Sequence, residues 1–235
     1  MKRFFGTAIL VILPALCCAQ TVSVGAGHWE GSIVGGPGQE LRIEIDLAKN
    51  DKQVWLGVIS VPEQHLSEYP LGDIVIEVTS VKFAMKGIPG DPTFAGRPAA
   101  DGKSIAGQWT QGGNTMTCNL TRTGDAKMRP RPPIAKEFQG QWQGTLDANG
   151  TKLRLLFKLA NQADGTGSGT LTSIDQGPQE IPITAITQNG TGLKLEVVPI
   201  AGTYTGELNK DGTEIAGQWT QGPGTFPLNL KRAAK

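Results

Sequence analysis

Histidine and cysteine are scarce in this 235-residue sequence, which contains two histidines and three cysteines. His28 and His65 are not spaced as a metal-binding pair, and no cysteine accompanies them in a zinc-ligand pattern. The sequence also lacks the Gly-x-Ser-x-Gly motif that exposes a nucleophilic serine in α/β-hydrolases. These absences predict a protein that is not an enzyme, with no catalytic residue set, metal site or cofactor.

The chain also lacks an excess of basic or acidic residues. The chain carries 22 basic and 21 acidic residues, for a formal net charge of +1 at pH 7. A protein that binds nucleic acid uses a basic face to displace counterions from phosphates, and no such cluster occurs here. We therefore expect no nucleic-acid partner.

Long hydrophobic runs are confined to the N-terminus, where two basic residues precede an apolar stretch over residues 4–16 and small residues follow as far as Ala19. That stretch is shorter than the ~20 residues of a membrane span. It has the pattern of a secretory signal peptide, residues 1–19, cleaved near Ala19. The sequence predicts a periplasmic or secreted protein without a transmembrane anchor. The alternative, a lipid anchor on Cys17 or Cys18, lacks the small preceding residue that lipidation expects.

Cleavage at that site leaves Cys118 as the remaining cysteine, so an intramolecular disulfide is excluded. Stability must then come from a hydrophobic core. The matching position in the second half of the chain is Leu228. This favours Cys118 as a small buried hydrophobe over a reactive thiol.

The octapeptide IAGQWTQG occurs twice, at residues 105–112 and 215–222. Four further pairs of segments match around it: residues 28–31 with 141–144, 41–47 with 153–159, 94–96 with 204–206, and 119–122 with 229–232. A repeat of this length exceeds the about 20–50 residues of solenoid and propeller units. The chain is therefore predicted to contain two copies of one β-domain, residues 20–121 and 138–235.

Between the copies lies a joint, residues 122–137, with three prolines and five basic residues. Proline fixes φ and removes a hydrogen-bond donor, so a chain rich in proline stays extended. The composition predicts a semi-rigid linker.

Both copies read as short strands joined by tight turns. Residues 41–47 and 193–197 alternate apolar with charged side chains, the period of two that places one set on each face of a strand. Asp-Gly and Asn-Gly pairs mark primed hairpin turns; they occur at Asp101-Gly102, Asn149-Gly150, Asp164-Gly165, Asn189-Gly190 and Asp211-Gly212. With seven to eight strands per copy, we expect an all-β protein of two tandem antiparallel meander β-barrels, lipocalin-like or streptavidin-like, with β-sandwiches as the alternative.

The second copy resembles a known family. The matching segments are residues 142–144, 173–177, 181–183, 204–206, 211–212 and 217–222. They resemble the accessory β-domain that precedes the catalytic domain in secreted bacterial α/β-hydrolases of the dienelactone-hydrolase-like kind, over nearly all of residues 138–232. The first copy fits less well, because residues 60–65 read SVPEQH where the second copy has SIDQG. The resemblance implies an accessory role and a secreted hydrolase as a partner, with the catalytic domain itself missing.

Two equivalent tryptophans are the best candidates for a site. A period of two puts Trp109 on the same strand face as Ile105, and Trp219 occupies the same place in the second copy. The favoured interpretation is a plug that fills one end of each barrel and bonds its N–H to a backbone carbonyl. The alternative is an aromatic wall of a ligand cavity. The candidate ligand-binding residues in that case are Trp109, Trp219, Tyr204, Asp175 and Gln176.

We therefore expect an exported, non-catalytic binding or accessory module acting on a small apolar ligand, a glycan or a partner protein. Two alternatives stay open: a structural envelope protein, and a hydrolase-related enzyme with an unrecognised site. An enzyme would need titratable groups gathered in one pocket. A ligand-sized cavity would distinguish the binding module from the structural protein.

Cleavage of the N-terminal segment gives the first prediction. The intact mass of the exported protein should correspond to a chain that begins at Gln20, because the small residues of a signal peptidase site end at Ala19. Mass spectrometry of the exported fraction measures this. A mass that includes acyl chains on Cys17 or Cys18 would contradict it.

Overall fold

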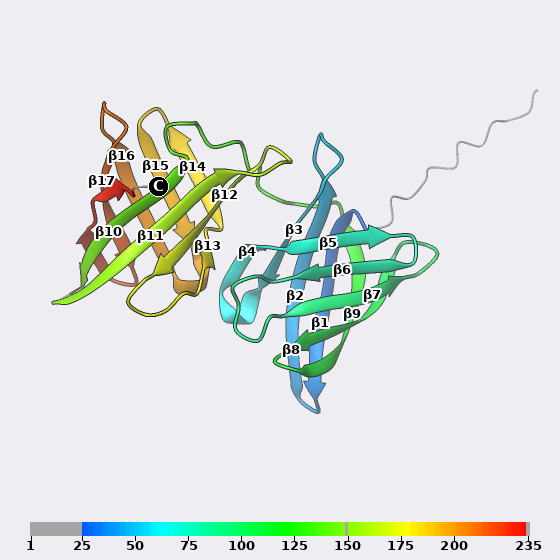
Figure 1. Ribbon diagram of the computed structural model, residues 1–235. Coiled ribbons are helices and arrows are strands. Elements are labelled where there is room, and N and C mark those ends of the chain that lie inside the picture. The colour runs from blue at the N-terminus through cyan, green and yellow to red at the C-terminus, as the bar shows by residue number, and fades with distance from the viewer. Residues whose placement is uncertain (1–24, 149, 234–235) are drawn as a thin grey trace, which may run out of the picture.

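The computed structural model describes residues 25–148 and 150–233, which form two antiparallel sheets (Figure 1). The first sheet contains β1 (Gly27–Gly36), β2 (Gln39–Lys49), β3 (Trp55–Val61), β4 (Leu66–Pro70), β5 (Gly72–Glu77), β6 (Ser80–Ala84), β7 (Thr93–Pro98), β8 (Ser104–Gln111) and β9 (Asn114–Gly124). The second contains β10 (Gly140–Ala148), β11 (Thr151–Asn161), β12 (Gly167–Ser173), β13 (Ile181–Pro182), β14 (Ala185–Asn189), β15 (Gly192–Val197), β16 (Gly202–Leu208), β17 (Glu214–Gln221), β18 (Gly224–Pro227) and β19 (Leu230–Arg232). The expected signal peptide, residues 1–19, lies outside the described residues.

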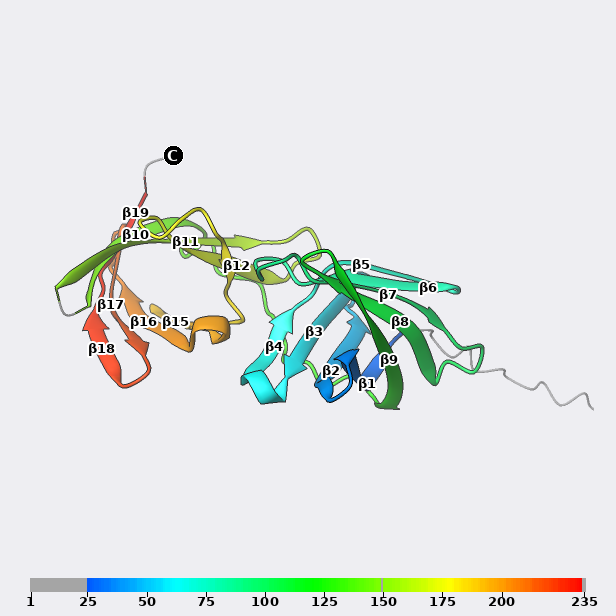
Figure 2. The same cartoon turned by 90° about the horizontal axis from the view of Figure 1, so that it is seen from below.

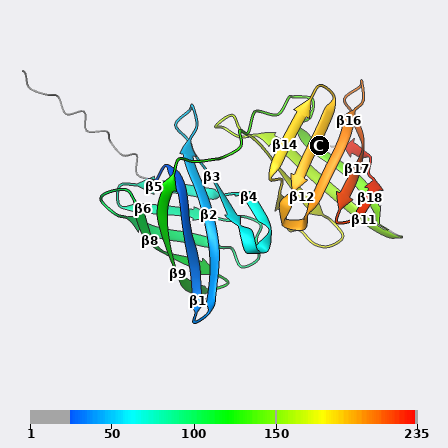
Figure 3. The ribbon, with the colours of Figure 1, turned by 180° about the vertical axis from the view of Figure 1, so that it is seen from behind.

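Each sheet curls into a nearly closed barrel, so the expected all-β meander architecture is confirmed. In barrel 1 the strand order is β4-β3-β2-β1-β9-β8-β7-β6-β5, in which chain neighbours pair except for β4 and β5, and β1 pairs with β9 (Figure 3). Figure 2 shows β5 to β8 curling over β1 to β4. The opening lies between β4 and β5, where the Leu71 N–H still donates to the Gly57 carbonyl over 2.9 Å.

Barrel 2 repeats this order with one break. Its path runs β13-β12-β11-β10-β19-β17-β16-β15-β14, and β18 pairs with β17. The strands β18 and β19 together occupy the place of β9, interrupted after Pro227, which cannot donate to the ladder. None of the described helical segments is long and apolar enough to cross a membrane.

The strand count differs from the expected seven to eight per copy, since the sheets have nine and ten strands. The strands missed by the sequence pattern are short ones that lack alternation. β4 ends in Pro70, and β13 consists of Ile181 and Pro182. Proline is found on edge strands because it has no N–H to pair, and both strands form the open edge of their barrel.

The duplicated octapeptide forms β8 and β17, and its glycines make room for an aromatic ring. A Cβ on Gly107 would lie 2.5 Å from Phe94 Cζ, and one on Gly217 would lie 2.6 Å from the Tyr204 hydroxyl. The terminal glycine turns the hairpin, with φ of 56° at Gly112. The octapeptide therefore carries out the same folding task in both barrels.

Two further tryptophans sit at the strand that closes each barrel. Trp29 on β1 and Trp142 on β10 are fully buried. Each indole N–H donates to the carbonyl four residues earlier, Trp29 to Gly25 over 3.0 Å and Trp142 to Phe138 over 2.7 Å. A buried indole needs such a partner. The bond ties the chain that precedes each barrel to the barrel core.

The joint contributes residues to both barrels. Its first residues, 122–124, complete β9. Its last part belongs to barrel 2, because Ile134 is 3% exposed within that core and its N–H donates to Asn161 Oδ1 over 2.6 Å. The Ala135 N–H donates to Gln188 Oε1 over 2.9 Å. Two strands of barrel 2 thus hold the joint in place.

Direct contacts also connect the barrels. The β2–β3 turn of barrel 1 meets the β11–β12 turn of barrel 2, where Asn50 Nδ2 donates to the Asp164 carbonyl over 3.3 Å and Lys52 Nζ lies 3.4 Å from the Ala163 carbonyl. Val198 of barrel 2 packs against the core cluster of barrel 1. The two open edges lie in the same region, between the barrels (Figure 1).

Burial of the joint gives the second prediction. Ile134→Ala should lower the free energy of unfolding of barrel 2 by about 2–5 kcal/mol, because it removes a buried side chain and leaves a cavity. Urea unfolding of residues 126–235 measures the change. The matched control is Ile174→Ala, at a 37% exposed position on the β12–β13 loop, which should change stability far less. Equal effects of the two substitutions would mean that the joint is not part of the core.

Candidate functional site

The aromatic candidates lie inside the barrels. Trp109 is 3% exposed in barrel 1, whereas Trp219 at 2% and Tyr204 at 0% are cross-strand neighbours in barrel 2. The Tyr204 hydroxyl donates to the Ile215 carbonyl over 3.0 Å, and burial raises the pKa of this phenol above its usual value. Trp219 packs edge-on against Phe157, with ring centroids 6.2 Å apart. These side chains fill the core, as the plug interpretation expects, but the expected bond to a backbone carbonyl is wrong for Trp219, whose Nε1 donates to the side-chain Oε1 of Gln221 over 3.2 Å.

The polar candidates lie elsewhere, on the exposed loop after β12. The Arg154 guanidinium donates from Nη2 and Nε to Asp175 Oδ1 over 2.6 and 2.9 Å, and the Arg154 N–H donates to Asp175 Oδ2. These bonds lower the pKa of the Asp175 carboxyl. The Gln176 N–H donates to the Ser173 carbonyl over 3.0 Å, which closes the turn. The five candidates are therefore not gathered in one place.

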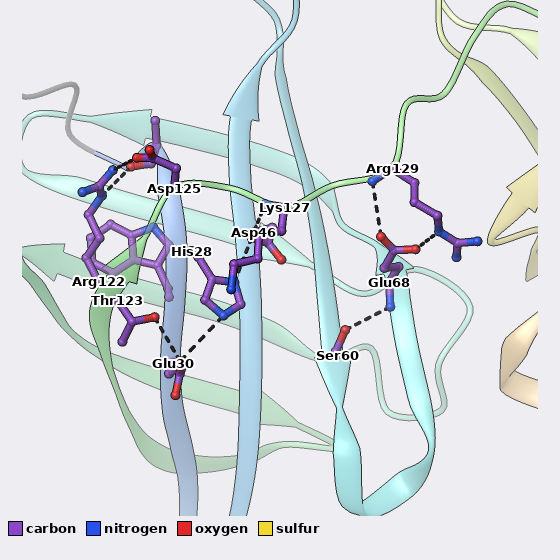
Figure 4. A network of polar contacts seen from close by, with 12 residues as sticks. His28, Glu30, Asp46, Ser60, Glu68, Arg122, Thr123, Asp125, Lys127 and Arg129 are labelled. Atoms are coloured by element: carbon purple, nitrogen blue, oxygen red, sulfur yellow. Dashed lines mark hydrogen bonds and ion pairs between the residues drawn. The ribbon is translucent and has the colours of Figure 1, made fainter.

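His28 takes part in a polar network on the outside of barrel 1 (Figure 4). Its Nδ1 lies 2.8 Å from Asp46 Oδ1 and its Nε2 lies 3.7 Å from Glu30 Oε1. The same Asp46 oxygen accepts the Lys127 N–H over 2.8 Å. The imidazole thus links β1 to β2 through Asp46, and the Asp46 carboxylate fastens the joint to barrel 1.

The Cys118 thiol is fully buried on β9, in the core of barrel 1. Burial raises its pKa to about 12, so the thiolate is scarce at neutral pH. Thiol chemistry requires the thiolate. Cys118 therefore lies in a setting suited to packing.

Arg129 of the joint connects the two barrels. Its backbone N–H lies 3.3 Å from Glu68 Oε1, and its guanidinium also pairs with that carboxylate (Figure 4). On the other side its Nη1 lies 3.4 Å from Glu196 Oε2 of barrel 2. Exposed ion pairs stabilise weakly, by about 0–1 kcal/mol. The contribution of Arg129 is to fix where the joint crosses between the barrels.

Between the barrels, beside this crossing, lies a hollow of about 600 Å³ that we call the seam groove. It is within the range of about 300–1,000 Å³ of small-molecule sites. Its lining residues come from both barrels and the joint: Pro70, Leu71, Gly72, Lys86, Arg131, Gly140, Gln141, Lys158, Leu159, Ala160, Gln162, Ser168, Gly169, Thr170, Pro182 and Ile183. The proline-containing edges β4 and β13 thus face the same hollow.

Arg131 is the unusual residue of the seam groove. Its side chain also lines a smaller hollow of about 90 Å³ beside Arg129. Desolvation lowers its pKa, and the nearest charges that oppose this are those of Glu68 and, more weakly, Asp164. Its guanidinium forms no hydrogen bond or ion pair with any residue in 25–148 or 150–233. A guanidinium has five N–H donors, so Arg131 has donors beside the groove that no acceptor in the described part of the chain engages.

Sequence reasoning missed this groove because no motif marks it. The joint was recognised by its prolines and basic residues, but the separate places of Arg129 and Arg131 depend on how the barrels pack. The one available signal is that the joint has no counterpart in the duplication, whereas most of the chain does.

No protein-family model and no curated protein matches the chain. Solved structures with a related shape are distant. A protein of unknown function from the DUF3598 family of Nostoc punctiforme is 10% identical, with 89% of this chain and 96% of that chain covered and a TM-score of 0.27. A candidate outer membrane protein from Bacteroides fragilis is 12% identical, with 88% and 97% covered and a TM-score of 0.28. At these identities and TM-scores the likenesses do not bear on function.

The buried position of Trp219 gives the third prediction. Trp219→Ala should lower the free energy of unfolding by about 3–5 kcal/mol, because a buried ring is removed and the core cannot close the space. Chemical denaturation measures this. Trp55→Ala, which removes a half-exposed indole at the start of β3, is the matched control and should cost less. If Trp219→Ala costs under about 1 kcal/mol, the range of surface changes, the ligand-wall alternative gains support.

Proposed function

We propose that the protein is an exported, non-catalytic binding module that holds a small apolar ligand in the seam groove. The observation that carries this proposal is the groove itself. It is lined mainly by apolar atoms from the edges of both barrels, and its volume suits a small molecule. The interiors of the barrels, in contrast, are filled by tryptophan, tyrosine, phenylalanine and aliphatic side chains.

The N-terminal pattern of residues 1–19 supports export. The duplication supports a binding role, because it places two barrels side by side. Two barrels that meet along their open edges create one hollow that neither has alone. Such a hollow between two rigid units is a common place for ligands, because domain interfaces provide concave surfaces. Arg129 and the turn residues Asn50 and Asp164 make the polar contacts between the barrels beside this hollow.

A second candidate is an accessory role towards a glycan or a secreted hydrolase, in line with the family resemblance of residues 138–232. A second hollow of about 570 Å³ on the outer face of barrel 2 favours it. Exposed polar side chains cross this face in a row of paired neighbours: Thr187, Lys194, Thr205 and Gln218. A polar row of this kind suits a hydroxyl-rich or charged partner.

Filling the groove gives the fourth prediction. Ala160 is exposed on β11 and lines the seam groove, so Ala160→Trp should occupy the hollow without disturbing the core. We expect the neutral fluorescent probe 1-N-phenylnaphthylamine to bind the mature protein and to lose at least about tenfold in affinity for this variant, since apolar contact area is removed.

The matched control is Ala216→Trp, at an exposed position on β17 outside the seam groove, which should bind the probe as the wild type does. Melting temperatures of both variants check that the fold is intact. If the probe binds Ala160→Trp with wild-type affinity, or does not bind the wild type, the seam groove is not the site.

A further inference from the structure

We propose that the ligand of the seam groove carries a single anionic head group on an apolar tail, and that Arg131 binds the head group. This inference rests on the proposed function of the groove and specifies the chemistry of its ligand. A carboxylate is the simplest such head group. Ion pairing leaves one of the cations that line the groove without a partner among the described residues, and the surface beside it is apolar.

Three cations line the seam groove, and two of them already have partners. Lys86 pairs with Asp73, and Lys158 pairs with Glu180. The third, Arg131, has no such partner among the described residues, and the carboxylate of nearby Glu68 is engaged by Arg129. The charge that remains available to a ligand in the groove is therefore that of one guanidinium.

Arg131 is half-buried at the edge of the groove. Desolvation lowers its pKa, although a guanidinium stays protonated at any physiological pH. A half-buried charge without a protein partner gains more from a bound counter-charge than a fully exposed one does. An anion in the groove would supply the acceptors that the guanidinium lacks. The planar fork of arginine can bind both oxygens of a carboxylate at once.

The surface next to Arg131 suits an apolar tail. Pro70 and Leu71 lie on the barrel 1 side of the groove, and Pro182 and Ile183 lie on the barrel 2 side. One charged end and two apolar walls fit an amphiphile better than a fully polar ligand.

The test compares decanoate with decanol, which share an alkyl chain and differ in the charge of the head group. Isothermal titration calorimetry of the mature protein should show decanoate binding at least about tenfold more tightly than decanol. Arg131→Gln should weaken decanoate about 10- to 100-fold, the range for loss of a charged hydrogen bond, and leave decanol unchanged. Lys210→Gln, which removes an exposed cation outside the groove, is the matched control and should change decanoate affinity less than about threefold, since a distant exposed charge is screened by solvent.

A second measurement separates a ligand-binding arginine from a structural one. Because the half-buried Arg131 guanidinium forms no hydrogen bond or ion pair with the described residues, Arg131→Gln should keep or raise the melting temperature of the free protein. A fall in melting temperature together with weaker binding of both ligands would overturn the proposal. So would equal affinity of the wild type for decanoate and decanol; in that case the groove, and with it the proposed function, stands if Ala160→Trp blocks both. Failure of both ligands to bind the wild type would contradict both proposals.

Discussion

Trp29 and Trp142 occupy the same place in the two barrels, on the strand that pairs with the last strand of its sheet. Each indole fills the core and bonds to the chain just before the barrel, so sheet closure, core packing and the entry of the chain depend on one side chain. Close packing of this kind leaves interiors as dense as organic crystals. Because aromatic side chains fill the barrels, we propose the surfaces where the barrels meet, and not the barrel interiors, as the place for a ligand.

Much of the fold could be predicted from the sequence, because its signals are local. The alternation in residues 41–47 and 193–197 forms strands β2 and β15. The Asp-Gly and Asn-Gly pairs do turn the chain, and their glycines have positive φ, but the expected primed turn type is wrong, because Asp101, Asp164, Asn189 and Asp211 do not have the positive φ that it also requires. The duplicated octapeptide has matching contacts in both barrels. Gln111 donates to the Pro89 carbonyl and Gln221 to that of Ile200, each fastening a neighbouring loop. The residues of the duplicated octapeptide are therefore ones that both barrels need in order to fold.

The candidate site could not be predicted in the same way. Pro70 and Pro182 stand in strands too short for a periodic pattern, and Ile134 looks like part of a linker until its burial in barrel 2 is known. The surroundings of Arg131 depend on the distance between two barrels, which no local pattern encodes. The features that mark the seam occur once in the chain, so the duplication that revealed the architecture gave no sign of them. The folding residues are duplicated and the proposed binding residues are not.

The central claim is that this protein binds its ligand between the barrels and not within them. A crystal structure of the mature protein with decanoate tests it most directly. We expect electron density for the carboxylate beside the Arg131 guanidinium and for the alkyl chain along the surface formed by Pro70, Leu71 and Pro182. Density for the ligand inside a barrel, in contact with Trp219 or Trp109 and with the seam groove empty, would contradict the claim.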